Sequence, residues 1–178
     1  MKRSAKRNSR AGFTLIETLV VIAIMGILSA MLISYNHAST TQLALASDQA
    51  TVAGALNRAK ALTLEKYTPG LTGGATACAY GVHFASSSYI VYGVLGDSSC
   101  DNVGDFSYSG AATTTVVQTL QLDAGIAFTT APTDIYFVPP YLEAKSVPAG
   151  AATVVIEDMN DGQIAKVTVS PGGAVSME

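Results

Sequence analysis

The chain begins with basic residues and then becomes continuously apolar. From Thr18 to Tyr35 eighteen positions carry no charged residue, and Leu, Ile, Val and Met predominate among them. A helix of this length spans ~27 Å, close to the ~30 Å hydrocarbon thickness of a bilayer. No later segment of the sequence is comparably apolar. The pattern therefore predicts one membrane-spanning helix near the N-terminus.

The helical pattern continues beyond the apolar run. Between Ala38 and Lys66 there is no proline and a single glycine, and alanine is frequent, which favours helix. At 100° per residue the segment has an apolar face and an opposite polar face. The apolar face carries Leu45, Val52, Leu56 and Ala59, and the polar face carries Thr51, Arg58 and Glu65. Because Pro69-Gly70 ends the pattern, we expect one helix of ~81 Å from Phe13 to Lys66.

From Leu71 the sequence changes to short β-branched and aromatic runs separated by Gly, Ser and Thr. Asp158-Met159-Asn160-Asp161-Gly162 is typical of a hairpin turn, because these residue types tolerate positive φ. Pro139-Pro140 and Gly150 interrupt the middle of the region. The expected strands are 77–84, 88–94, 113–122, 126–129, 134–138, 153–157, 165–169 and 174–177. The fold class is therefore α+β, a long helix packed on an antiparallel β-rich head.

Charge is distributed unevenly along the 178 residues. Five of the ten basic residues lie in the first ten positions, whereas the remainder has five basic and thirteen acidic residues, 5 − 13 = −8. Charged residues make up only 13% of the chain, and hydrophobic residues make up 49%, which excludes a disordered protein. Basic residues stay on the cytoplasmic side of a membrane-spanning helix. We therefore expect the chain after residue 35 to lie outside the cytoplasm.

Two ordinary explanations of this N-terminus fit poorly. A secretory signal, with cleavage near Ala38, has an apolar core of ~7–15 residues. Here the apolar segment runs from Phe13 to Ile33 and contains Glu17. A plain membrane anchor leaves that carboxylate unpaired, at a cost of roughly 2.5–3.5 kcal/mol. Glu17 therefore needs a partner that neither explanation supplies.

The segment Gly12-Phe13-Thr14-Leu15-Ile16-Glu17, between a basic leader and the apolar run, resembles the N-terminus of type IV prepilins and type II secretion pseudopilins. The resemblance implies that a prepilin peptidase cuts between Gly12 and Phe13 and methylates the new N-terminal amine. It places Glu17 at the family's fifth mature position, where it would pair with the amine of a neighbouring subunit. It also implies a structural role, with the other pilin or pseudopilin subunits as partners through the N-terminal helix.

This resemblance divides the chain into four segments. They are a cleaved leader 1–12, a transmembrane half-helix 13–35, an amphipathic half-helix 36–70 and a head 71–178. The protein is expected in the inner membrane, with its leader cytoplasmic and its head periplasmic or extracellular, and in a filament after assembly. Residues 56–178 are loosely similar to H-type minor pseudopilins and related minor pilins. Many major pilins have proline at the position of Ser34, whereas Gly26 matches the family as a site of helix loosening.

Cys78 and Cys100 are the only cysteines, and both lie in the segment placed outside the cytoplasm. Disulfides persist in such compartments, and a bond here would add ~3 kcal/mol of stability in the chain-entropy model. The alternative is two free, buried thiols. Metal binding through cysteine is not expected, because no CxxC or adjacent histidine accompanies either residue.

The sequence offers little for catalysis, and we expect neither an enzyme nor a cofactor. The two histidines, His37 and His83, belong to no catalytic or metal-binding motif, and no phosphate-binding glycine loop is present. A calcium site is the minority hypothesis, because Asp97, Asp101 and Asp105 crowd one Gly/Ser/Asn-rich loop. Their spacing matches no fixed motif, and a solvated acidic loop is the alternative.

DNA binding is the rival function, because some minor pilins of this family capture DNA for uptake. Phosphate contacts need a basic surface. From Leu71 onward the head has two basic residues, Lys145 and Lys166, against ten acidic ones. Its C-terminal tail, Ser170 to Glu178, has no arginine. We therefore expect no nucleic-acid partner.

Overall fold

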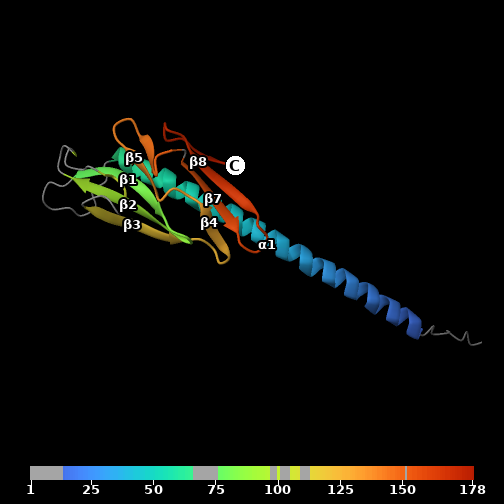
Figure 1. Ribbon diagram of the computed structural model, residues 1–178. Helices are drawn as coiled ribbons and strands as arrows, with labels where there is room; N and C mark the ends of the chain where they lie inside the picture. Colours follow the sequence, from blue (N-terminus) through green and yellow to red (C-terminus); the bar gives the residue numbers. More distant parts are fainter. Residues whose placement is uncertain (1–13, 66–75, 97–99, 101–104, 109–112, 151) are drawn as a thin grey trace, which may run out of the picture. The chain divides into compact units, whose positions relative to one another are not determined.

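The computed structural model describes residues 14–65, 76–96, 100, 105–108, 113–150 and 152–178 (Figure 1). A single long helix, α1, covers Leu15–Glu65. The chain divides into two compact units, Met1–Thr40 and Thr41–Glu178. The first contains the apolar part of α1, and the second contains the rest of α1 and all the strands. The long helix predicted from the sequence is confirmed, with ends close to those expected.

The second unit contains two antiparallel sheets (Figure 1). The five-stranded sheet has the order β3-β2-β1-β5-β6, and the four-stranded sheet has the order β4-β7-β8-β9. The strands of the larger sheet are β1 Thr76–Phe84, β2 Ser88–Gly96, β3 Thr114–Gln121, β5 Asp134–Val138 and β6 Glu143–Val147. Those of the smaller sheet are β4 Ile126–Thr130, β7 Ala152–Asp158, β8 Ile164–Val169 and β9 Val175–Met177. The α+β fold class is therefore confirmed.

The core of the second unit forms where α1 packs on both sheets. The four predicted apolar-face residues of α1, from Leu45 to Ala59, are all buried, and Thr51, Arg58 and Glu65 on the opposite face are exposed. The larger sheet contributes buried residues such as Val82, Val91 and Ile135, and the smaller sheet contributes Val154, Ile156 and Val167. Burial of apolar surface at ~25 cal/mol per Å² is what holds helix and sheets together.

One strand was missed by the sequence prediction. The breaks expected around Pro139-Pro140 and Gly150 enclose β6, which pairs along its length with β5. Its sequence, EAKSV, has two charged residues and little apolar character. Lys145 and Glu143 lie exposed on it, 3.6 Å apart. The strand forms because β5 supplies a hydrogen-bonding edge, and that edge comes from the fold rather than from the local sequence.

Candidate functional site

The first turn of α1 places Glu17 at a defined position. The Glu17 N–H donates to the Thr14 carbonyl at 3.1 Å and lies 3.4 Å from Thr14 Oγ1. The Thr18 N–H donates to the same carbonyl at 3.3 Å. Thr14 therefore caps the helix, and Glu17 occupies the third helical position of a Thr-x-x-Glu capping box. Gly12 and Phe13 lie outside the described residues.

The helix that follows exposes an apolar surface. Residues Leu15–Leu32 are long and apolar enough to cross a membrane, the single such helix among the described residues. Each of the large apolar side chains along this stretch is exposed. Their exposed fractions lie between 46% at Val21 and 82% at Leu15. Thr18 satisfies its hydroxyl internally by donating to the Leu15 carbonyl at 2.9 Å. An apolar surface of this extent is covered by lipid or by other helices in a stable assembly.

Polar side chains connect the second part of α1 to the head. Gln49 Nε2 donates to the carbonyls of Lys166 at 2.8 Å and Glu178 at 3.1 Å. Lys60 Nζ donates to the Gly173 carbonyl at 2.9 Å. These bonds connect the helix to β8, to the C-terminal residue and to the β8–β9 turn. The helix is thereby fixed to the smaller sheet by directional contacts as well as by apolar burial.

Asp48 is a carboxylate buried at the same junction. Its Oδ2 accepts the Asp123 N–H at 2.9 Å, and its side chain lies on the apolar face of α1. Burial raises the pKa of Asp48 and is the largest effect. The backbone hydrogen bond from Asp123 lowers this pKa by less than burial raises it, and the charge of Asp123 raises it further. Burial, together with the charge of Asp48, raises the pKa of the nearby Tyr89 to about 12. Asp48 was not among the residues predicted for the apolar face, although its spacing from Leu45 and Val52 places it there.

Cys78 and Cys100 form a disulfide, with their Cα atoms 5.6 Å apart. Among the described residues no cysteine is free. The bond attaches the connection between β2 and β3 to β1. Beyond it, Tyr92 donates its hydroxyl to the Phe106 carbonyl at 3.0 Å. The described part of this connection therefore packs on the larger sheet at more than one point.

His83 and Asp134 add a second attachment for this connection. His83 Nδ1 lies 3.1 Å from Asp134 Oδ1, and the same oxygen accepts the Tyr108 N–H at 3.2 Å. The His83 ring stacks on Tyr108 with centroids 4.8 Å apart. His83 lies between the buried Asp134 carboxylate and the Tyr108 ring. Tyr108 thus contacts His83 of β1 and Tyr92 of β2, which attaches the described part of the connection to the sheet.

The calcium hypothesis is not tested by the described residues. Asp97 and Asp101 lie outside them, and Asp105 Oδ1 accepts the Ser107 N–H at 2.8 Å within a turn. Among the described residues no group of three or more His, Cys, Asp or Glu side chains could hold a metal ion.

His37 lies in the part of α1 where side chains are not described. Glu157, Asp158 and Asp161 lie around the β7–β8 hairpin turn, in which Asp158 and Asp161 cap backbone N–H groups.

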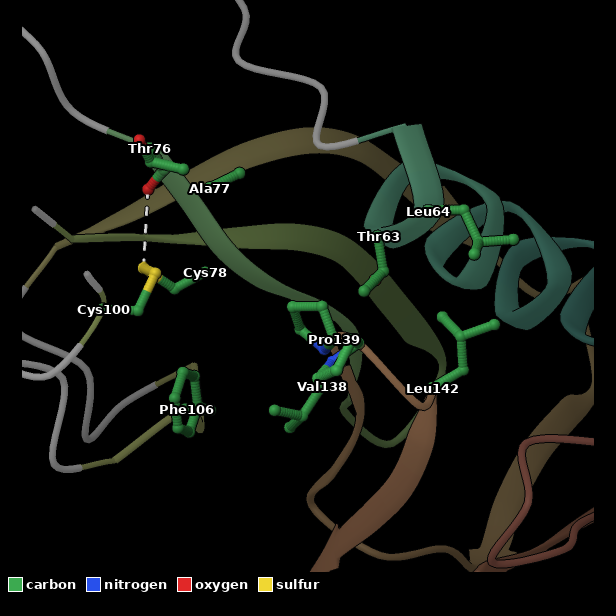
Figure 2. A pocket seen from close by; sticks show the side chains of 11 residues that line it. Thr63, Leu64, Thr76, Ala77, Cys78, Cys100, Phe106, Val138, Pro139 and Leu142 are labelled. Atoms are coloured by element: carbon green, nitrogen blue, oxygen red, sulfur yellow. Dashed lines mark hydrogen bonds between the residues drawn. A yellow bond between two sulfur atoms is a disulfide. The ribbon is translucent and has the colours of Figure 1, made fainter. Parts of the chain in front are cut away.

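A cavity of about 420 Å³ lies beside the disulfide (Figure 2). Figure 2 shows Leu64 at the end of α1 and Leu142 after β5 on one side, and Cys100 and Phe106 on the other. Among the described residues its lining is apolar or uncharged, with Thr63 and Thr76 as its hydroxyl-bearing side chains.

The comparisons agree with the N-terminal signal. Residues 7–33 match the family model described as the prokaryotic N-terminal methylation motif. This match covers residues 7–12 before the expected cleavage point, together with Phe13, Glu17 and the apolar helix, and it supports the type IV pilin and pseudopilin family. No curated protein and no solved structure matches the chain.

Proposed function

We propose that the chain is a minor subunit of a type IV pilus or a type II secretion pseudopilus, made as a precursor and processed by a prepilin peptidase. One observation carries the proposal: a helix with every large apolar side chain exposed over Leu15–Leu32 directly follows the methylation signal. A membrane covers this surface before assembly, and neighbouring helices cover it afterwards. The leader is cytoplasmic and the head lies outside, because the leader carries five basic residues and no acid.

Cleavage after Gly12 changes the electrostatics of the helix start. It removes the five cations of the leader and creates an amine on Phe13, next to the capping residue Thr14. Glu17 stands exposed in the first turn of the same helix. In a low-dielectric environment an unpaired amine or carboxylate is costly, so the amine of one subunit pairs with Glu17 of the next. The pair sets the register in which a new subunit leaves the membrane.

The placement as a minor subunit at or near the filament tip rests on the loose similarity of residues 56–178 to H-type minor pseudopilins. On this proposal the mature chain has a transmembrane half-helix 13–35, an amphipathic half-helix 36–70 and a head 71–178. The buried face of α1 from Leu45 to Ala59 gives the head a rigid attachment to the helix. The head would then be presented outside the membrane while the apolar helix holds the subunit in place.

Replacing Glu17 tests the assembly role. We expect Glu17→Gln to leave cleavage at Gly12 intact but to reduce incorporation into filaments by roughly tenfold or more, because the uncompensated amine costs at least the 1.4 kcal/mol that equals a factor of ten. The measurement is the amount of subunit in sheared filaments relative to the amount in membranes. Glu65→Gln is the matched control, an exposed acid at the other end of α1. Normal incorporation of the Glu17 variant would contradict the pairing.

A further inference from the structure

A groove runs between α1 and the edge strand β3 on the head. Its volume is about 290 Å³, and it is lined by Thr51, Gly54, Ala55 and Arg58 of α1 and by Gln118 and Leu120 of β3. A Cβ at Gly54 would meet no atom within 4 Å, so the groove has free space at this position. All these residues belong to the second unit. The groove therefore lies within the second unit and not on the apolar part of α1.

Arg58 gives the groove a positive charge, and no carboxylate of the described residues forms an ion pair with it. Its Nη1 donates to Gln118 Oε1. In the part of the chain that the structure describes, the ion pairs join His83 to Asp134 and Lys145 to Glu143, and neither involves Arg58. A guanidinium has five N–H donors, so one bond to a neutral amide leaves donors available. Because arginine can only donate, Gln118 must turn its oxygen toward Arg58, which leaves the amide N–H groups of Gln118 as further donors.

The adjacent strand offers backbone groups as well. β3 is the outermost strand of the larger sheet on this side, and its sequence, TTVVQTLQ, carries no charge. The Leu122 N–H donates to the Ser87 carbonyl, so the alternation of an antiparallel ladder turns the N–H and C=O groups of Thr119 and Gln121 away from β2. Among the described residues no hydrogen bond covers these outward groups. The groove thus has a cation in its lining, and outward backbone N–H and C=O groups lie on the same strand beside it.

We propose that this groove binds a carboxylate-bearing segment on the head of a neighbouring pilin-type subunit, an inference that rests on the proposed function. Charge complementarity selects this occupant. From Leu71 onward the head has ten acidic and two basic residues, so two such heads repel over most of their surfaces. An unpaired guanidinium with amide donors beside it matches a carboxylate in both charge and geometry. In the groove, the Arg58 guanidinium would attract a carboxylate of the neighbouring head.

The test is photo-crosslinking in cells with the full chain. A photoreactive residue at Thr51, on the rim of the groove, should give a crosslink to another subunit that carries the methylation signal. The same residue at Ile164, exposed on β8, is the control position and should give little of that product. Arg58→Glu should lower the Thr51 crosslink roughly fivefold, the effect of losing an exposed ion pair, whereas Arg58→Lys should retain most of it.

The outcomes separate this proposal from the function on which it rests. If the chain is cleaved after Gly12 and enters filaments, but Thr51 gives no crosslink to a subunit or Arg58→Glu leaves the yield unchanged, the groove proposal is wrong and the proposed function stands. If the chain is never cleaved, both fail. The melting temperature of Arg58→Glu checks the fold, and we expect little change because the side chain is exposed.

Discussion

At the scale of single residues, the junction between α1 and the head contains an acid that the protein keeps buried. Asp48 accepts one backbone hydrogen bond from Asp123 and lies near the negative charge of that residue. Tyr89, whose hydroxyl has no hydrogen-bond partner among the described residues, lies close by. Burying a charged carboxylate costs free energy unless it is well paired, so burial raises the pKa of Asp48 in the folded protein.

The raised pKa of Asp48 predicts that the stability of the folded protein depends on pH. The pKa of Asp48 is raised above 3.8 in the folded protein, so its contribution to stability is full below that value and is lost as the pH rises through the raised pKa. Asp48→Asn, which stays neutral, should therefore gain stability relative to the native chain as the pH increases from 4 to 7. Thermal unfolding of both proteins in detergent, followed by near-UV circular dichroism, measures the difference. A variant that loses stability relative to the native chain over this range would contradict the prediction.

Gly81 and Gly54 lie in different environments, so replacing each by alanine gives a matched pair of variants. A Cβ at Gly81 would lie 2.7 Å from Tyr136 Cβ and 2.8 Å from the Ile135 carbonyl, whereas a Cβ at Gly54 meets open space. Gly81→Ala should reduce the free energy of unfolding by about 1–3 kcal/mol, the usual cost of overpacking. Gly54→Ala should raise it by about 0.5–1 kcal/mol, because alanine favours helix. Denaturant titration of both variants checks these signs, and equal effects would show that the close contacts at Gly81 do not matter.

At the scale of elements, the sequence predicts those parts whose local preferences agree with the fold. The helix has alanine, a capping threonine and a regular apolar face, so its course and its buried residues could be predicted. The strand β6 has none of these signals and forms because β5 lies beside it. The attachment of His83 to Asp134 and Tyr108, and the contact of Arg58 with Gln118, join residues far apart in sequence. Such contacts depend on how the sheet and helix pack, which local patterns do not encode.

The disulfide joins β1 covalently to the connection between β2 and β3 and should stabilise the folded chain. Cys78 and Cys100 are 22 residues apart, and closing a loop of this size adds ~3 kcal/mol in the chain-entropy model. The Cys78→Ser, Cys100→Ser double variant should therefore unfold at a clearly lower denaturant concentration than the native chain. A reducing agent should lower the midpoint of the native chain and leave that of the variant unchanged. A native midpoint that is insensitive to reduction would show that the bond adds little.

At the scale of the whole molecule, two units with different surfaces follow one another along the chain. The first presents apolar side chains over Leu15–Leu32, and the second has one buried apolar core. The leader carries five basic residues, while the remainder carries a net charge of −8. The N-terminal signal could be recognised from the sequence because it is a contiguous motif. On the proposed function, lipid covers the apolar helix before assembly and the helices of other subunits cover it afterwards.

The central claim is that this chain is cut after Gly12 and methylated on Phe13. Mass spectrometry of the N-terminal peptide from protein purified from membranes or filaments measures this directly. The account predicts a mature chain that begins with N-methylated Phe13 and contains no leader. An N-terminus near Ala38, as a secretory signal would give, or an intact leader in the assembled protein would contradict it.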